Sequence, residues 1–214
     1  MLIDLNLEGK CVVVVGGGSE GYRKTVDFLD AGAKVLVVSQ SFSSNMANLN
    51  REKKISIRKE KLENAKSFIN NFDPKPDVVV AVTSDHKFNS SLLECAKSAG
   101  CMVYAPDNPS VSDFALPATA RIGDVRIAVS TGGKSPAMAS VLRKRIEKLV
   151  TAEDLLQIKL QEYLREVLKK QVSNQKVRKE LLYKVIRDDD IKRLLKGNKF
   201  EEAKEKAKSI VKKT

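Results

Sequence analysis

The sequence predicts an α/β fold in which a parallel sheet is followed by a small hairpin-helix region and a C-terminal helical module. Three observations support this prediction. Short β-branched runs alternate with amphipathic segments before Phe114, as in βαβ units. From Phe114 onward two alternating strands flank a tight turn, and the final stretch is helical in pattern. We therefore divide the chain into residues 1–113, 114–150 and 151–214.

A glycine-rich turn follows the first apolar strand, Val12 to Val15, and leads directly into a helical pattern. Gly16 permits the tight turn, Gly18 lets backbone N–H groups approach a pyrophosphate, and Gly21 lets the helix lie close to the strand. A second strand, Val35 to Val38, follows within the length of a βαβ unit. This context favours a Rossmann-like dinucleotide site over a glycine turn that serves packing alone.

The residues after the second strand lack the acid that a typical NAD site uses to bind ribose hydroxyls. Gln40 and Ser41 stand there instead and can still hydrogen-bond a ribose. Without the acid, however, this position does not distinguish NAD from NADP. A later strand, Asp77 to Val82, runs directly into Thr83, on the sheet edge that would face the cofactor.

The strand Met102 to Tyr104 leads into a turn that contains Asp107 between two prolines. The prolines stiffen the turn and put a carboxylate at the crevice end of the sheet, where a base or a ligand is useful. An aspartate that only forms an Asx turn is an equal alternative. His86 is the only histidine, and we interpret it as an exposed surface residue rather than a titrating group. One histidine cannot form a metal cluster, so we assign no metal ligands.

Two strands, Leu116 to Ile122 and Val125 to Ser130, flank a tight turn and predict a β-hairpin. The loop Thr131 to Pro136 then precedes a helix, with Ser135 as N-cap and Pro136 at the first helical position. A glycine loop before a helix N-terminus can be a second anion site. It can equally be a plain exit from the hairpin.

The helix after this loop carries an apolar stripe at three- and four-residue steps, wider than contact with its own sheet requires. The stripe consists of Met138, Val141, Leu142, Ile146, Leu149 and Val150. It predicts a homodimer formed through the hairpin and this helix. Further apolar stripes in residues 151–214 predict a small helical module, with breaks at Ser173-Asn174 and Gly197-Asn198.

The formal net charge of +12 would suit a nucleic-acid partner. The charges of residues 151–214 are of both signs, however, and aromatic residues that could stack on bases are scarce. A polyanionic small substrate accounts for the basic balance equally well, so we expect no nucleic-acid partner. The sequence shows neither a membrane span nor a signal-peptide layout. We therefore expect a cytoplasmic protein without membrane association.

Four motifs, taken together, resemble the precorrin-2 dehydrogenase and sirohydrochlorin ferrochelatase family, of the siroheme synthase N-terminal type. The motifs are Gly16-Gly17-Gly18 with Arg23-Lys24; Ala81 to Asp85 with Asn89; Asp107 and Pro109 with Asp113-Phe114 and Pro117-Ala118; and Ala128 to Pro136. The resemblance covers roughly residues 1–150 and implies a Rossmann domain, a dimerisation region and a helical domain. Members oxidise precorrin-2 to sirohydrochlorin with NAD, an oxidoreductase step of siroheme and porphyrin biosynthesis. Some members also insert ferrous iron, so the resemblance leaves ferrochelatase activity open.

The resemblance also assigns cofactor contacts position by position. Ser19, Glu20, Gln40 and Ser41 match NAD-contact positions. Glu20 departs from the family pattern, which usually has an aliphatic residue there, and it puts a carboxylate near the phosphates. Ser112 departs as well, because a cysteine is common at that position.

For the substrate, Asp107 matches the essential aspartate of the family and is our candidate base. Thr131 matches a hydroxyl position in the substrate loop. Arg121, Arg126 and Lys134 are expected to join it in binding the carboxylates of the tetrapyrrole, since arginine suits bidentate contact.

Two other functions stay open at this point. One is a non-enzymatic NAD-sensing module, in which the nucleotide orders the Rossmann unit and the basic helical tail binds a partner. The other is a different NAD oxidoreductase that acts on a small acid. Asp107 and the loop Thr131 to Pro136 favour an enzyme over a sensor, since a sensor needs neither.

Overall fold

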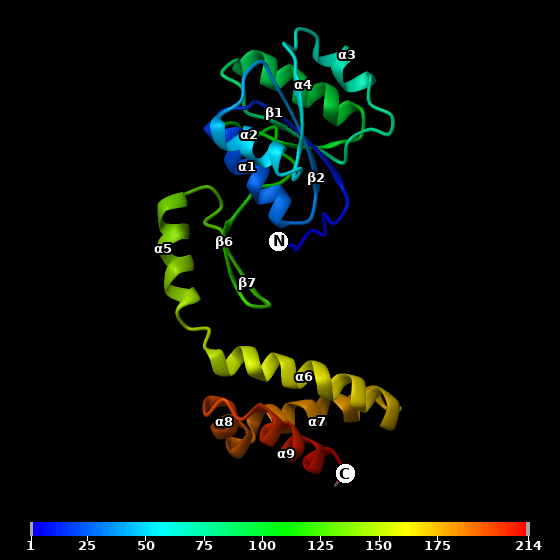
Figure 1. Cartoon of the computed structure of the whole chain (residues 1–214), viewed down its shortest axis with the longest axis vertical. Helices are drawn as coiled ribbons and strands as arrows, with labels where there is room; N and C mark the ends of the chain where they lie inside the picture. The colour runs from blue at the N-terminus through cyan, green and yellow to red at the C-terminus, as the bar shows by residue number, and fades with distance from the viewer. Residues whose placement is uncertain (1, 213–214) are drawn as a thin grey trace. The chain divides into compact units, whose positions relative to one another are not determined.

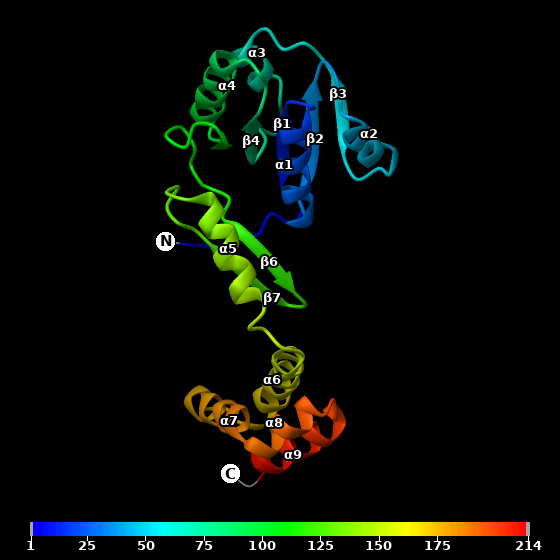
Figure 2. The same cartoon turned by 90° about the vertical axis from the view of Figure 1, so that its left-hand side faces the viewer.

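The computed structural model describes residues 2–212, and the chain divides into two compact units between Leu116 and Pro117. Met1, Lys213 and Thr214, which the sequence analysis assigned to the first and third domains, lie outside the described residues. Figure 1 and Figure 2 show both units, with all their helices and most of their strands labelled.

The described part of the first unit contains a parallel five-stranded sheet in the order β3-β2-β1-β4-β5. Its strands are β1 (Cys11–Val15), β2 (Lys34–Ser39), β3 (Ser56–Lys59), β4 (Val78–Ala81) and β5 (Met102–Tyr104). Its helices are α1 (Ser19–Asp30), α2 (Ser44–Arg51), α3 (Ala65–Asn70) and α4 (His86–Ser98). The strand order reverses direction at β1 and β4, which is the crevice where this type of fold binds dinucleotides. The predicted Rossmann-like α/β fold is confirmed.

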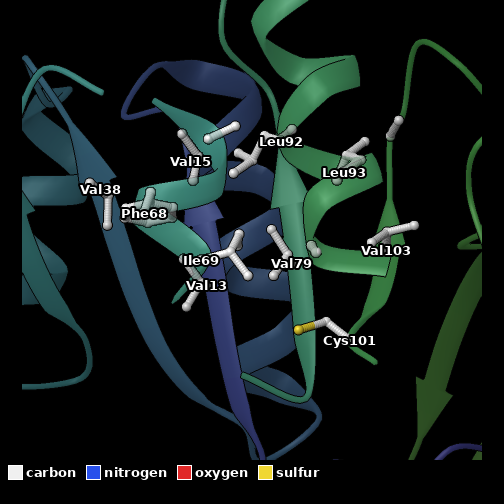
Figure 3. Close-up of a cluster of buried hydrophobic side chains, with 14 residues drawn as sticks. Val13, Val15, Val38, Phe68, Ile69, Val79, Leu92, Leu93, Cys101 and Val103 are labelled. Atoms are coloured by element: carbon white, nitrogen blue, oxygen red, sulfur yellow. The ribbon is translucent and has the colours of Figure 1, made fainter. Parts of the chain in front are cut away.

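The central strands β1 and β4 are buried on both faces of the sheet, as their β-branched residues predict. Val13 and Val15 of β1 point into a cluster that contains Phe68 of α3 and Leu92 of α4, as Figure 3 shows. The alternate residues of β1 contribute to a second cluster on the opposite face, with Phe28 of α1. Each such buried side chain contributes roughly 1.5–3 kcal/mol. The carboxyl end of β1, where the glycine turn begins, is therefore firmly placed.

The second unit begins with an antiparallel hairpin, β6 (Ala118–Ile122) and β7 (Val125–Val129), against which α5 (Pro136–Glu147) packs. Ser135 caps α5 by accepting a hydrogen bond from the N–H of Met138, and Pro136 is the first helical residue, so the predicted helix start is confirmed. The helices α6 (Ala152–Gln171), α7 (Gln175–Arg187), α8 (Asp189–Lys196) and α9 (Phe200–Lys212) share one apolar core (Figure 1). None of the helices in the described part of the chain is long and apolar enough to cross a membrane.

Candidate active site

The glycine turn after β1 is shaped by close backbone contacts. Gly16 has φ +130°, and a Cβ atom there would lie 2.6 Å from the carbonyl oxygen of Val82. A Cβ atom at Gly21 would collide with the carbonyl oxygen of Gly16. Gly17 is equally confined by the carbonyl oxygen of Ser41. Three of the four glycines in this turn are therefore required by packing, whatever else the turn does.

Gly18 differs from its neighbours because a Cβ atom there would meet no protein atom within 4 Å. It is the N-cap of α1 and offers no side chain to the backbone N–H groups of the first helical turn. Those groups carry the positive end of the helix dipole and remain available to an anion. Open space above a glycine at a helix N-terminus fits a pyrophosphate, so the shape of the turn is compatible with a bound dinucleotide.

Ser19 and Glu20 form the first turn of α1, next to this open space. The Glu20 carboxylate pairs with Arg23, and it also lies 3.9 Å from the Nζ of Lys24. These two cations offset the negative charge of Glu20, which would otherwise repel bound phosphates. The departure of Glu20 from the family pattern is thus accommodated within the helix itself.

Gln40 and Ser41 are exposed and lie in the loop that joins β2 to α2. The N–H of Ser43 donates a 2.9 Å hydrogen bond to the carbonyl oxygen of Gly17, which ties this loop to the glycine turn. Both predicted ribose contacts therefore lie beside the turn, on the β2 side of the crevice.

Thr83 follows β4 by two residues at the same edge of the sheet, and a buried asparagine holds it. Its hydroxyl donates to Oδ1 of Asn89 at 2.6 Å, and the Asn89 amide donates back to the Thr83 carbonyl at 3.0 Å. Asn89 is only 4% exposed. Asn89 thus holds the segment after β4 in place, and the hydroxyl proton of Thr83 is already engaged there.

Asp107 lies in the loop after β5, and two side chains further along the chain hold that loop. The Ser112 hydroxyl accepts from the N–H of Ala105 at 2.9 Å and donates to the Ala105 carbonyl at 3.1 Å. Asp113 accepts from the N–H of Val103 at 2.9 Å and pairs with Lys97 at 2.5 Å. The Lys97 ammonium, followed by the Val103 N–H, lowers the pKa of Asp113.

The Asp107 carboxylate meets the imidazole of His86, the first residue of α4. The Nδ1 atom of His86 and Oδ2 of Asp107 are 2.7 Å apart. Both side chains line a hollow of about 180 Å³ with Asn89, Ser90 and Asn108. Their side chains remain open to solvent, with exposed fractions of 76% for His86 and 45% for Asp107. A hydrogen-bonded, accessible carboxylate at the sheet edge is suited to proton transfer.

The four predicted substrate contacts lie in the second unit. The hairpin register pairs Arg121 directly with Arg126, so both exposed guanidinium groups extend from one face. Thr131 accepts the N–H of Ser135 at 3.0 Å, and its carbonyl accepts the N–H of Lys134 at 3.2 Å. The structure therefore groups the two arginines on the hairpin, and Thr131 with Lys134 in the loop before α5.

Sequence reasoning missed the side chains that support the site. His86 is exposed as predicted, but its pairing with Asp107 was not predicted, because the two residues are 21 positions apart. Asn89 and Asp113 stood in the motifs without a role, and Ser112 was noted only as a departure. Polar residues after the strand Asp77 to Val82 and after the Asp107 turn were the available signal. Within residues 2–212, no group of three or more His, Cys, Asp or Glu side chains is placed to hold a metal ion.

Comparison with known proteins places this chain in a family. The chain is 32% identical over 204 residues to the precorrin-2 dehydrogenase of Methanosarcina barkeri, covering 95% of this chain and 88% of that one. The chain belongs to the precorrin-2 dehydrogenase family. Residues 3–118 match a family of NAD(P)-binding domains, and residues 123–149 match the central region of sirohaem biosynthesis proteins.

Two further relatives show how far the likeness extends. The solved structure of SirC, a precorrin-2 dehydrogenase, superposes with a TM-score of 0.75 at 21% identity and covers 98% of this chain and 99% of that one, which shows a shared fold. The siroheme synthase of Nitrosomonas europaea is 33% identical over 146 residues. The chain spans 30% of the length of that siroheme synthase.

Proposed function

We propose that the chain oxidises precorrin-2 to sirohydrochlorin with NAD, as a step in the biosynthesis of siroheme. Family membership supports the reaction, and the position of Asp107 supports it most directly. The glycine turn follows β1 and the Asp107 loop follows β5, with β4 between them. Because parallel strands end at one edge of a sheet, a dinucleotide bound at the turn and a base at Asp107 would share that edge.

The residues of the first unit divide the work of binding. The helix N-terminus above Gly18 would hold the pyrophosphate, and Gln40 and Ser41 would contact the adenosine ribose. Ser19, Glu20 and Thr83, which follows β4, would border the rest of the nucleotide, with Gly16 and Gly21 shaping the turn. When bound, NAD supplies the acceptor for a hydride from the tetrapyrrole.

Oxidation of precorrin-2 also releases a proton, and Asp107 is the group we assign to accept it. The Asp107 carboxylate is 45% exposed and lies in a hollow large enough to admit one edge of a larger molecule. We further assign Arg121, Arg126, Thr131 and Lys134 to the carboxylates of the substrate. The paired arginines suit bidentate contact with carboxylate groups.

We also propose that the protein is a homodimer formed through the hairpin and α5. Several apolar side chains of the predicted stripe are exposed in the single chain, namely Met138 (46%), Val141 (39%), Ile146 (40%) and Leu149 (74%). Clustered exposed apolar side chains usually mark an interface. Light scattering at micromolar concentration tests this proposal, and a monomer would contradict it.

The reaction is tested by incubating the protein with precorrin-2 and NAD while following the absorbance of NADH and of sirohydrochlorin. Both should rise together. Parallel reactions with NADP establish the cofactor preference, and ferrous iron added after the oxidation tests for siroheme formation. Tight NAD binding without any NADH would instead favour the NAD-sensing function.

A further inference from the structure

Asp107 has one side-chain partner within the described residues, and that partner is His86. The loop that carries Asp107 is already closed by Ser112 and Asp113, which bind the backbone of Ala105 and Val103. The His86 contact adds nothing to that closure, because it reaches the carboxylate and not the loop backbone. Its effect falls on the orientation of the carboxylate.

We propose that His86 is a positioning residue for Asp107 in the oxidation of the tetrapyrrole, a role that rests on the proposed function. The imidazole Nδ1–H donates to Oδ2 of Asp107 at 2.7 Å and holds the carboxylate in one rotamer. The other carboxylate oxygen, Oδ1, is then presented to the substrate and takes the proton. Without this hydrogen bond, an exposed aspartate samples several rotamers, and fewer of them face the substrate.

The start of α4, where His86 lies, is held without the His86 side chain. Asp85 caps the helix by accepting the N–H of Phe88 at 2.9 Å, so the helix start does not depend on the imidazole. The His86 carbonyl accepts the hydroxyl of Ser90 at 3.0 Å, inside the same helix. A substitution at position 86 therefore removes the contact with Asp107 and leaves the cap in place.

Two variants of His86 separate positioning from proton acceptance. His86→Ala removes the donor, whereas His86→Asn keeps an N–H at the same number of bonds from the backbone as Nδ1 but cannot accept a proton. We expect His86→Ala to lower kcat for precorrin-2 oxidation about tenfold, the size of one lost hydrogen bond to a charged group. His86→Asn should recover most of that loss. The KM for NAD and the melting temperature should be unchanged in both.

Lys87→Ala is the matched control, because Lys87 is an exposed neighbour on the same helical turn. It should leave kcat at the parent value. Equal losses of kcat in His86→Ala and His86→Asn would overturn the proposal and make the imidazole itself the proton acceptor. Parent-level kcat in His86→Ala, or a kcat loss matched by a lower melting temperature, would also overturn it and leave the pair as a surface tie.

Failure of the proposed function would look different. In that case the parent protein itself would form no NADH from precorrin-2. The comparison among the three variants is made only on a parent that turns over, so the two failures are distinguished by the first measurement.

Discussion

The glycine turn and the Asp107 loop lie at the same edge of one sheet, but different kinds of contact hold them in place. Close backbone packing holds the turn: an added Cβ atom at Gly16 or Gly21 would collide with a carbonyl oxygen. Side-chain hydrogen bonds hold the loop: Ser112 binds its backbone, and His86 contacts the Asp107 carboxylate. The turn is therefore sensitive to any added atom, whereas the loop is sensitive to the loss of particular polar groups.

The largest expected effect is on the loop. Asp107→Asn keeps the shape of the side chain and much of its hydrogen bonding but removes the proton acceptor. Loss of a general base typically costs about 10²–10⁴-fold in rate, so turnover of precorrin-2 should fall by that order while NAD affinity barely changes. Steady-state kinetics with calorimetry for NAD provide the measurement. Turnover within a few-fold of the parent would make the aspartate structural or confine it to metal insertion.

The next effect is on the turn. Gly18→Val should weaken NAD binding by about a hundredfold or more, because the added side chain fills the space left for the pyrophosphate. The fold should survive, since φ at Gly18 is −77° and a Cβ atom there meets no protein atom. Calorimetry and circular dichroism measure the two quantities. Unchanged NAD affinity in a folded variant would remove the dinucleotide assignment.

Gly21→Ala is the counterpart in which the fold, not the ligand, should suffer. The new methyl group would collide with the carbonyl oxygen of Gly16, and α1 would have to move away from β1. Overpacking of this kind costs roughly 1–3 kcal/mol, which denaturant unfolding can resolve. A Gly21→Ala variant as stable as the parent would mean that the turn has more freedom than its backbone contacts imply.

The smallest effect is expected at the loop anchor. Asp113→Asn should lower the free energy of unfolding by about 1 kcal/mol at neutral pH, because it weakens the contacts with Lys97 and the Val103 N–H. The folded-state pKa of Asp113 is depressed, chiefly by Lys97. Its contribution is therefore complete above the unfolded value of about 3.9 and is lost as the pH falls through the folded value.

Unfolding of parent and Asp113→Asn proteins at neutral pH and at a series of pH values well below about 4 measures this loss. The gap between them should close in acid. A gap that stays constant with pH would show that the anchor works by shape and not by charge.

The sequence alone determined the buried strands, the start of α5 and the glycine turn, because each depends on neighbours within a few positions. The β-branched runs specify buried strands, and Ser135 with Pro136 specifies the start of α5. The glycine turn was identified in the same way, since local sterics decide where a side chain fits. Asp107 was singled out by its prolines and its strand end, although its role stays a prediction.

Only the tertiary structure decided which side chains meet. The pairing of β4 with β5 places the start of α4 next to the loop after β5, and so brings His86 to Asp107. Periodicity reports which face of an element is buried, but it does not report strand order or the distance between two loops. Contacts between polar side chains on exposed loops leave no apolar pattern, so they appear only when the chain is folded.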